Sequence, residues 1–343
     1  MQRVNLYSDT QTRPTPAMRR AMAEAEVGDE QHFGDPTVNA LCERVATLLG
    51  FDAAVFLPSG TMCNAIGFRL HIRAGGDEVY LHRISHPIKA EAGGPAAISG
   101  AVLCPLEGER GMFDAATLAA AMRPPDDRYH PRSRLVSVEQ TTNLAGGHVW
   151  PLTQLREVVE VAKANDLRLH MDGARLMNAV VASGIPTTEW TLGFDTAWLD
   201  FSKGLGAPMG GVLAGSHELI EEAWRYKQMF GGALRQAGIV AAGALYALDH
   251  HVERLALDHE NARTLAHGLA GMPGVEIDPA EVATNIVVFR VADADALCTQ
   301  LAVNGVIMGA LDTRTVRAVT HLDVGAEDIA TALEVVGAAL AVA

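Results

Sequence analysis

Two predicted strand ends carry side chains of opposite charge. An apolar strand over Arg168–Met171 runs directly into Asp172, and another over Thr196–Phe201 is followed by Ser202 and Lys203. Because parallel strands bring their carboxyl ends to one edge of a sheet, where open α/β folds bind ligands, we expect the carboxylate and the amine to face one crevice.

An acid and a lysine in one crevice suit a particular cofactor. Pyridoxal 5′-phosphate (PLP) binds a lysine as a Schiff base, and a carboxylate beside its pyridine nitrogen keeps that nitrogen protonated, so that the ring can accept electrons from Cα of an amino acid. A lysine taken alone is as readily a solvated surface residue. The strand-end placement and the glycine at position 204 favour the cofactor, so we predict Lys203 and Asp172 in these two roles.

A candidate phosphate site follows the first predicted strand. Pro58-Ser59-Gly60-Thr61 opens a helix there. Backbone N–H groups at a helix N-terminus, together with a hydroxyl donor, are the groups that bind a phosphate. Ser59, Gly60 and Thr61 are therefore predicted to bind the phosphate of the cofactor.

Four further side chains could complete such a site. His86 follows the second predicted strand, where an imidazole could stack on the cofactor ring and reach the reacting side of a substrate, although a lone histidine is more often structural. Arg175 and Arg317 could bind a substrate carboxylate through paired hydrogen bonds, which suit a planar guanidinium. Arg235 lies in a glycine-rich segment, from which it could reach a phosphate.

The elements that position these residues have an α/β pattern. Short apolar runs alternate with helical segments from about residue 50 to residue 215, which predicts a large, mostly parallel, seven-stranded sheet covered on both faces. The predicted strands are Ala54–Leu57, Glu78–Leu81, Ala101–Pro105, Leu135–Glu139, Arg168–Met171, Thr196–Phe201 and Gly211–Ala214. The predicted helices between them include Thr61–Arg73, Asp114–Ala121 and Leu152–Asn165.

The C-terminal part has a different pattern. Helical periodicity runs over Glu218–Gln228 and Gln236–Gly271, after which strands are expected near Asn285–Val291 and Val316–Thr320, with helices between and after them. This predicts a smaller α+β domain. We divide the chain into an N-terminal segment (1–15), a large PLP-binding domain (16–250) and a small C-terminal domain (251–343).

Composition and charge exclude several classes of protein. The 343 residues are 49% hydrophobic and carry a net charge of −14, which argues against a nucleic-acid partner. No apolar run approaches the roughly 20 residues of a transmembrane helix, so we expect a cytoplasmic protein without a membrane partner. The four widely spaced cysteines are expected to be buried reduced thiols, and no cluster of ligands predicts a metal site.

These pieces together resemble the low-specificity L-threonine aldolases, which are PLP-dependent enzymes of the aspartate aminotransferase fold (fold type I). The resemblance covers nearly the whole chain. It rests on Ser8-Asp9-Thr10, Thr12-Arg13-Pro14-Thr15, Gly34-Asp35-Pro36-Thr37-Val38-Asn39, Pro58-Ser59-Gly60-Thr61, His86 with Glu91-Ala92-Gly93-Gly94, His170-Met171-Asp172-Gly173-Ala174-Arg175, Ser202-Lys203-Gly204-Leu205-Gly206-Ala207-Pro208 and Val319-Thr320-His321-Leu322-Asp323.

The resemblance also implies roles for individual residues. It implies Lys203 as the Schiff-base lysine, Asp172 at the pyridine nitrogen and His86 stacked over the ring. It implies that Ser8, together with Arg175 and Arg317, binds the substrate carboxylate. By the same resemblance Arg235 reaches the phosphate of a neighbouring subunit, within a homotetramer (a dimer of dimers) whose sites are shared between subunits.

Two segments depart from the family pattern. The family usually has Glu-Asn-Thr-His-Asn on the fourth strand, with its histidine facing the substrate hydroxyl, whereas this chain has Thr142 at the histidine's position. The Tyr-Gly that precedes Asp-Pro in the family is replaced by His32-Phe33-Gly34. His32 and Thr142 therefore belong to a rebuilt substrate pocket. The candidate bases are His86 directly, His86 through a water molecule, and His32 of a neighbouring subunit.

The expected activity is cleavage of the Cα–Cβ bond of L-threonine, L-allo-threonine or a related β-hydroxy-α-amino acid, giving glycine and an aldehyde. One alternative keeps the cofactor and changes the reaction, to β-elimination or transamination of a small amino acid. Another is a PLP-binding protein without catalysis. A nucleotide-binding dehydrogenase is disfavoured because no G-x-G-x-x-G follows an early strand.

Overall fold

The computed structural model describes residues 4–72 and 75–341, and Arg73, the last residue of one predicted helix, lies outside them. Its main feature is a seven-stranded sheet in the order β2-β8-β7-β6-β5-β3-β4, in which only β8 runs antiparallel to its neighbours. The strands are β2 (Ala53–Leu57), β3 (Glu78–His82), β4 (Val102–Leu106), β5 (Ser133–Glu139), β6 (Arg168–Gly173), β7 (Thr196–Asp200) and β8 (Gly211–Gly215). The predicted α/β class and mostly parallel sheet are confirmed.

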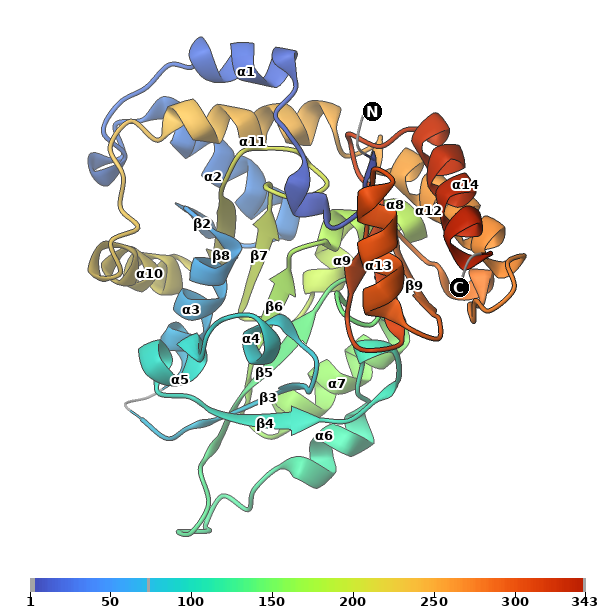
Figure 1. Cartoon of the computed structure of the whole chain (residues 1–343). Helices are drawn as coiled ribbons and strands as arrows, with labels where there is room; N and C mark the ends of the chain where they lie inside the picture. Colours follow the sequence, from blue (N-terminus) through green and yellow to red (C-terminus); the bar gives the residue numbers. More distant parts are fainter. Residues whose placement is uncertain (1–3, 73–74, 342–343) are drawn as a thin grey trace.

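Helices cover both faces of this sheet (Figure 1). One face packs against α2 (Pro36–Leu49), α6 (Ala115–Ala121), α7 (Leu152–Ala164), α8 (Leu176–Ser183), α9 (Thr187–Thr191) and α11 (Gly238–His250), and α1 (Pro16–Ala23) packs against α11. The other packs against α3 (Gly60–His71), α4 (His86–Lys89), α5 (Gly94–Ser99) and α10 (His217–Met229). The central strand β7 is buried at every residue, because a strand covered on two faces needs apolar side chains on both.

Short polar signals fix where the helices around the site begin. The Asp35 carboxylate accepts hydrogen bonds from the backbone N–H groups of Thr37 and Val38 and so caps α2, which has Pro36 at its first position. In the same way the Ser59 hydroxyl accepts from the N–H of Met62 and caps α3. The α3 cap follows β2 after a single residue, so it lies at the edge of the sheet.

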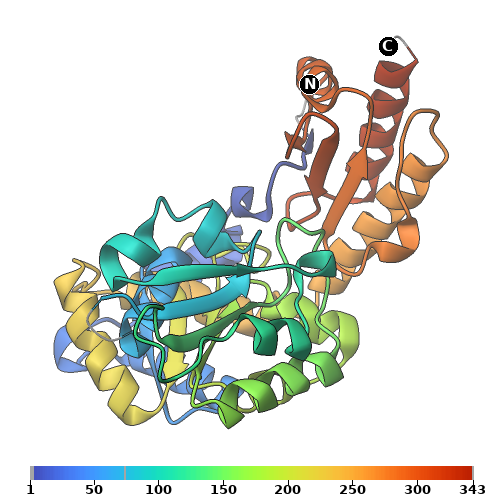
Figure 2. The same cartoon turned by 90° about the horizontal axis from the view of Figure 1, so that it is seen from below.

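The C-terminal part has a hydrophobic core of its own, formed by Val4, Leu6 and apolar residues between Ala262 and Ala339. It contains a sheet of β11 (Gly309–Ala310), β12 (Thr315–Val319) and β9 (Ile286–Arg290), with α12 (Leu255–Ala270), α13 (Ala294–Val303) and α14 (Ala326–Leu340). β1 (Val4–Asn5) pairs with β10 (Val306–Ile307), and Figure 2 shows this part projecting from the larger body. The C-terminal part thus has its own core, whereas Leu255 still packs in the core of the large sheet, and the bounds of the domain division stay a proposal.

Two expectations need correction. The helical pattern over Gln236–Gly271 is broken after His250, because residues 251–254 form a turn and the His251 side chain donates a hydrogen bond through Nδ1 to the carbonyl of Leu205. All four cysteines are free, but only Cys63 is buried, whereas the other three are half-buried. Across residues 4–72 and 75–341 no helix combines the length and apolar character of a membrane span.

Candidate active site

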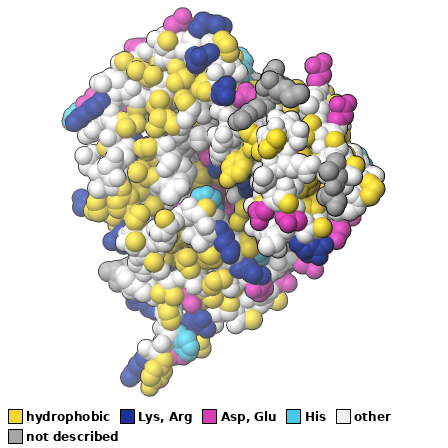
Figure 3. Space-filling model, viewed as in Figure 1, with side chains coloured by type: hydrophobic (Ala, Val, Ile, Leu, Met, Phe, Trp, Pro, Cys, Tyr) yellow, Lys and Arg dark blue, Asp and Glu magenta, His cyan; other side chains and the backbone are white. Residues whose placement is uncertain are grey.

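One pocket of about 430 Å³ lies at the carboxyl edge of the large sheet. On the face shown in Figure 3, a hollow separates the large body from the C-terminal part, with a histidine and charged side chains near its floor. The strands β5, β6 and β7, the start of α3, the N-terminal segment and β12 all contribute. The pocket is lined by Ser8, Thr10, Ser59, Gly60, Thr61, His86, Ala90, Glu139, Asn143, Leu144, Asp172, Ala174, Arg175, Trp198, Asp200, Ser202, Lys203 and Arg317.

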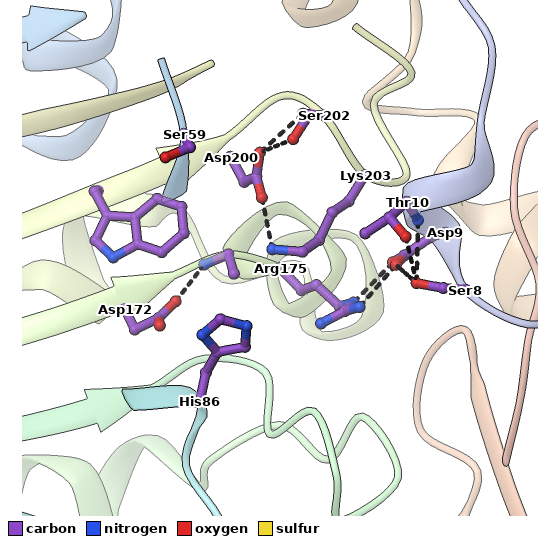
Figure 4. Close-up of polar contacts among 12 residues, drawn as sticks. Ser8, Asp9, Thr10, Ser59, His86, Asp172, Arg175, Asp200, Ser202 and Lys203 are labelled. Carbon is purple, nitrogen blue, oxygen red and sulfur yellow. Dashed lines mark hydrogen bonds and ion pairs between the residues drawn. The ribbon is translucent and has the colours of Figure 1, made fainter. Parts of the chain in front are cut away.

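Lys203 extends into this pocket from the turn after β7 (Figure 4). Its Nζ lies 2.5 Å from Oδ2 of Asp200, a buried carboxylate that also accepts hydrogen bonds from the N–H and the hydroxyl of Ser202. The Thr12 hydroxyl donates to the carbonyl of Lys203 and so fastens the N-terminal segment to this turn. The amine is therefore held in one place while its end remains in the pocket.

Asp172 is the second-last residue of β6, the strand beside β7, and only 2% of its surface is exposed. Its Oδ1 accepts a hydrogen bond from the N–H of Ala174, and its Oδ2 accepts one from Nδ2 of Asn64 at 2.8 Å. Both oxygens of this carboxylate are therefore hydrogen-bonded, which fixes its orientation. The pocket thus contains a fixed negative charge separate from the one beside Lys203.

His86 begins α4 on the opposite side of the pocket (Figure 4). Its Nδ1 lies 2.8 Å from Oε1 of Glu91, and this hydrogen bond raises the pKa of the imidazole although burial opposes the shift. The backbone N–H of His86 donates to Glu139, whose pKa is raised by burial and by the nearby Asp172. Glu91 therefore orients the imidazole, while Glu139 holds the backbone of His86.

The two predicted carboxylate-binding arginines differ in their partners. Arg175 donates from Nε and Nη2 to the two oxygens of the buried Asp9, each at 2.7 Å. Arg317 donates to Oδ1 of Asn143 and to the carbonyl of Tyr7, while its buried Nε has no partner. Burial and the charge of Arg175 lower the pKa of Arg317. Among the described residues no carboxylate pairs with Arg317, so it is the cation open to an incoming anion.

The residues at the start of α3 fit the phosphate of PLP. The first N–H groups of a helix have no partner within it, and those of Gly60 and Thr61 lie at the wall of the pocket. A Cβ on Gly60 would come within 2.4 Å of the Trp198 ring, so glycine is required where the helix approaches β7. Ser59 and Ser202 add hydroxyl groups, and the pocket volume suits a small cofactor.

The structure brings most of the predicted site residues together. Nine of them line this one pocket: Ser8, Ser59, Gly60, Thr61, His86, Asp172, Arg175, Lys203 and Arg317. Three do not. The buried Thr142 accepts a hydrogen bond from the N–H of His148, the exposed His32 lies in a short helix (Glu30–His32), and Arg235 pairs with Asp29 at the surface. Their predicted roles stay predictions.

Sequence reasoning missed several residues of the site, among them Asp200, Glu91, Asn64 and Asn143. Asp200 precedes Lys203 by three positions at the same strand end, so its spacing was available as a signal. Asn64 interrupts the apolar run Cys63-Asn64-Ala65-Ile66, and a polar side chain in a buried helix face requires a partner. Asn143 matches the last residue of the family's Glu-Asn-Thr-His-Asn segment, so the resemblance contained a signal for it.

The fold and the pocket, with a lysine, a buried aspartate and a phosphate cradle at one sheet edge, define a PLP-dependent enzyme of fold type I. The beta-eliminating lyase family model matches residues 5–292. Curated relatives include low-specificity L-threonine aldolase 1 of Arabidopsis thaliana, 38% identical over 96% of this chain and 94% of its own length. Another is the low specificity L-threonine aldolase of Escherichia coli K12, 40% identical over 95% of this chain and 96% of its own length.

Solved structures agree at the level of the fold. A threonine aldolase of Leishmania major superposes with a TM-score of 0.84 at 18% identity, covering 98% of this chain and 99% of that one. A putative L-allo-threonine aldolase of Listeria monocytogenes gives a TM-score of 0.79 at 22% identity, over 98% and 95% of the two chains. The chain belongs to the beta-eliminating lyase family, among the low-specificity L-threonine aldolases. It is a PLP-dependent lyase, as the sequence predicted.

Proposed function

We propose that this lyase cleaves the Cα–Cβ bond of L-threonine, L-allo-threonine or a related β-hydroxy-α-amino acid to glycine and an aldehyde. The observation that carries the proposal is the joint placement around one pocket of Lys203, Asp172 and Arg317, whose buried Nε has no hydrogen-bond partner among the described residues. These residues provide an amine for the cofactor, an acid for its ring and a cation for an amino-acid carboxylate. The names of the curated relatives support the same reaction.

Arg317 binds the substrate carboxylate in this proposal. Its Nε is buried without a partner, and a carboxylate would satisfy it through a charge-assisted hydrogen bond. Arg175 gives much of its hydrogen-bonding capacity to Asp9, so it contributes mainly positive charge and fixes the N-terminal segment that carries Ser8. Substrate orientation therefore depends first on Arg317.

Bond cleavage requires a base near the β-hydroxyl group. The bound PLP supplies an electron sink for the pair released when the Cα–Cβ bond breaks. His86 accepts the hydroxyl proton, the aldehyde leaves, and a proton delivered to Cα completes glycine. Asp172 keeps the ring nitrogen protonated and Lys203 holds the cofactor. Thr142 cannot accept a proton at neutral pH, and its hydroxyl is already bonded to the N–H of His148.

Product analysis tests this reaction. With L-threonine, L-allo-threonine and L-phenylserine as substrates, we expect glycine and the matching aldehyde in equal amounts. Formation of a 2-oxo acid and ammonia would instead indicate β-elimination, and accumulation of pyridoxamine phosphate would indicate transamination. Cofactor binding without any of these products would identify a PLP-binding protein that lacks this catalysis.

Replacing Arg317 by lysine should weaken substrate binding more than turnover. Lysine keeps the positive charge but loses the planar pair of donors, so we expect KM to rise about tenfold to hundredfold with kcat little changed. Steady-state kinetics with L-allo-threonine would measure both constants. Arg314→Lys, three positions away in sequence but outside the pocket and paired with Glu276, is the matched control. An unchanged KM in Arg317→Lys would remove Arg317 from substrate binding.

We also propose a cytoplasmic homotetramer, built as a dimer of dimers. Arg235 does not line the pocket of its own chain, so a role at a phosphate requires a second copy. The exposed apolar side chains Met229 and Ile239 flank it in sequence, and Phe33 follows its partner Asp29. Such groups suit an interface between subunits. Light scattering of the purified protein would give the mass that decides the oligomeric state.

A further inference from the structure

Asn64 lies between two carboxylates of the site, and its amide can be oriented in only one way. The amide oxygen, Oδ1, is 2.8 Å from Nε1 of Trp198, and an indole nitrogen can only donate a hydrogen bond. The amide nitrogen must therefore point the other way. There Nδ2 donates to Oε1 of Glu91 and to Oδ2 of Asp172, each at 2.8 Å. Asn64 is 1% exposed, so water does not compete for these bonds.

The same logic fixes the histidines behind Asn64. Nε2 of His170 lies 3.2 Å from Oδ1 of Asn64, so this nitrogen carries the proton and donates it. Burial lowers the pKa of His170 to about 3, and its neutral ring therefore accepts at Nδ1 from the Thr196 hydroxyl at 2.8 Å. Thr196 accepts in turn from Nε2 of His71 at 2.9 Å. Every hydrogen bond in this buried chain thus has a defined direction.

On the Glu91 side of Asn64, the same series of hydrogen bonds determines the tautomer of His86. Oε1 of Glu91 faces both the amide nitrogen of Asn64 and Nδ1 of His86, the latter at 2.8 Å. An ionised carboxylate can only accept, so Nδ1 of His86 must carry a proton. Nε2 is then the nitrogen that loses or gains a proton, and the ring lines the pocket (Figure 4).

We propose that Asn64 and Glu91 are positioning residues that hold His86 in its Nδ1–H tautomer, so that Nε2 serves as the proton acceptor of the site. By orienting His86, these hydrogen bonds would provide the base that Thr142 does not supply. A carboxylate that fixes a histidine tautomer has a large effect in other enzymes, because the wrong tautomer presents a donor where an acceptor is needed. The catalytic part of the inference rests on the proposed function, whereas the tautomer does not.

The charges around His86 give the direction of its pH dependence. Glu91, Asp172 and Glu139 face the imidazole with negative charge, and Lys203 faces it with positive charge. The hydrogen bond to Glu91 is the largest influence and raises the pKa, so the neutral, accepting form of Nε2 appears only at higher pH. The kcat/KM value should therefore rise with pH through a midpoint above 6.5, the ordinary value for histidine.

Two substitutions at Glu91 separate orientation from charge. Glu91→Gln keeps an oxygen that can accept from Nδ1, so it should retain the tautomer while moving the histidine titration to lower pH. Glu91→Met has a similar size and no acceptor oxygen, so it should shift the population toward the Nε2–H form. The measurement is ¹⁵N NMR of the histidine ring nitrogens in the protein without cofactor, with His86→Phe to identify the signal.

The activity readout then links the tautomer to catalysis. We expect Glu91→Met to lower kcat/KM about tenfold to hundredfold, with Glu91→Gln closer to the wild type at its own optimum. Glu78→Gln is the matched control, because Glu78 is equally buried but pairs with Arg123 at the far end of β3. An unchanged Nδ1–H population in Glu91→Met would overturn the inference. Absence of glycine in the wild type, with the tautomers as expected, would overturn the proposed reaction instead.

Discussion

Replacing Lys203 by alanine is expected to abolish covalent attachment of PLP and to lower the rate of glycine formation by about 10⁴-fold or more, because the residue supplies the amine that the cofactor needs. Borohydride reduction followed by mass spectrometry of the whole protein and its peptides measures the attachment directly. The wild type should carry one reduced cofactor per chain on the peptide that contains Lys203. The variant should carry none.

The control for this experiment is Lys163→Ala, which changes another lysine near a helix end, outside the pocket. It should retain both the reduced cofactor and the activity. A reduced cofactor on another lysine of the wild type would show that the amine has been assigned to the wrong residue. Full occupancy of the Lys203→Ala variant by reduced cofactor would show the same.

Replacing His86 by phenylalanine is expected to lower kcat by about 10²- to 10⁴-fold, the range that general-base catalysis usually contributes. Phenylalanine keeps a flat ring beside the cofactor and removes both ring nitrogens, so PLP binding should weaken much less than turnover. Rapid-quench measurement of glycine and fluorescence titration of PLP separate the two effects. A retro-aldol rate equal to that of the wild type would exclude His86 as the base.

A useful control for this variant is His148→Phe. The His148 ring lies outside the 430 Å³ pocket, and burial lowers its pKa. The His148→Phe substitution should leave kcat nearly unchanged. If both variants lose activity equally, the loss reflects packing rather than proton transfer, and His32 of a neighbouring subunit becomes the next base to test.

The sequence predicts the large sheet well because its signals are local. Each of the seven strands is a short apolar run, and the observed ends lie within two residues of the predicted ones. Lys203 and Asp172 could be placed at one edge because adjacent parallel strands deliver their last residues there. The start of α3 was equally accessible, since a hydroxyl cap and a glycine follow a strand directly.

Contacts between distant segments could not be predicted in this way. The partner of Arg175 is Asp9, 166 positions away in sequence, and Asn64 in α3 contacts Glu91 in a loop and Asp172 in β6. Helical periodicity continued through His251, whose hydrogen bond to the carbonyl of Leu205 is a tertiary contact that the local pattern does not contain. Such pairings depend on the fold as a whole.

The pocket wall around Thr142 shows the same limit of prediction from sequence. The motif predicts Thr142 beside the substrate, and this role stays a prediction; in the structure its hydroxyl accepts a hydrogen bond from the N–H of His148, and the neighbouring Asn143 lines the pocket. A shift of one residue along a strand end changes the direction of a side chain, which a motif alone does not specify. The pocket wall therefore has to be taken from the structure.

The most direct test of the account is the amount of glycine released per molecule of β-hydroxy amino acid consumed by the purified protein with PLP. We predict one glycine and one aldehyde for each L-threonine or L-allo-threonine consumed, and none with Lys203→Ala. Consumption of substrate with release of ammonia and no glycine would contradict the proposed cleavage and would assign the same pocket to an elimination reaction.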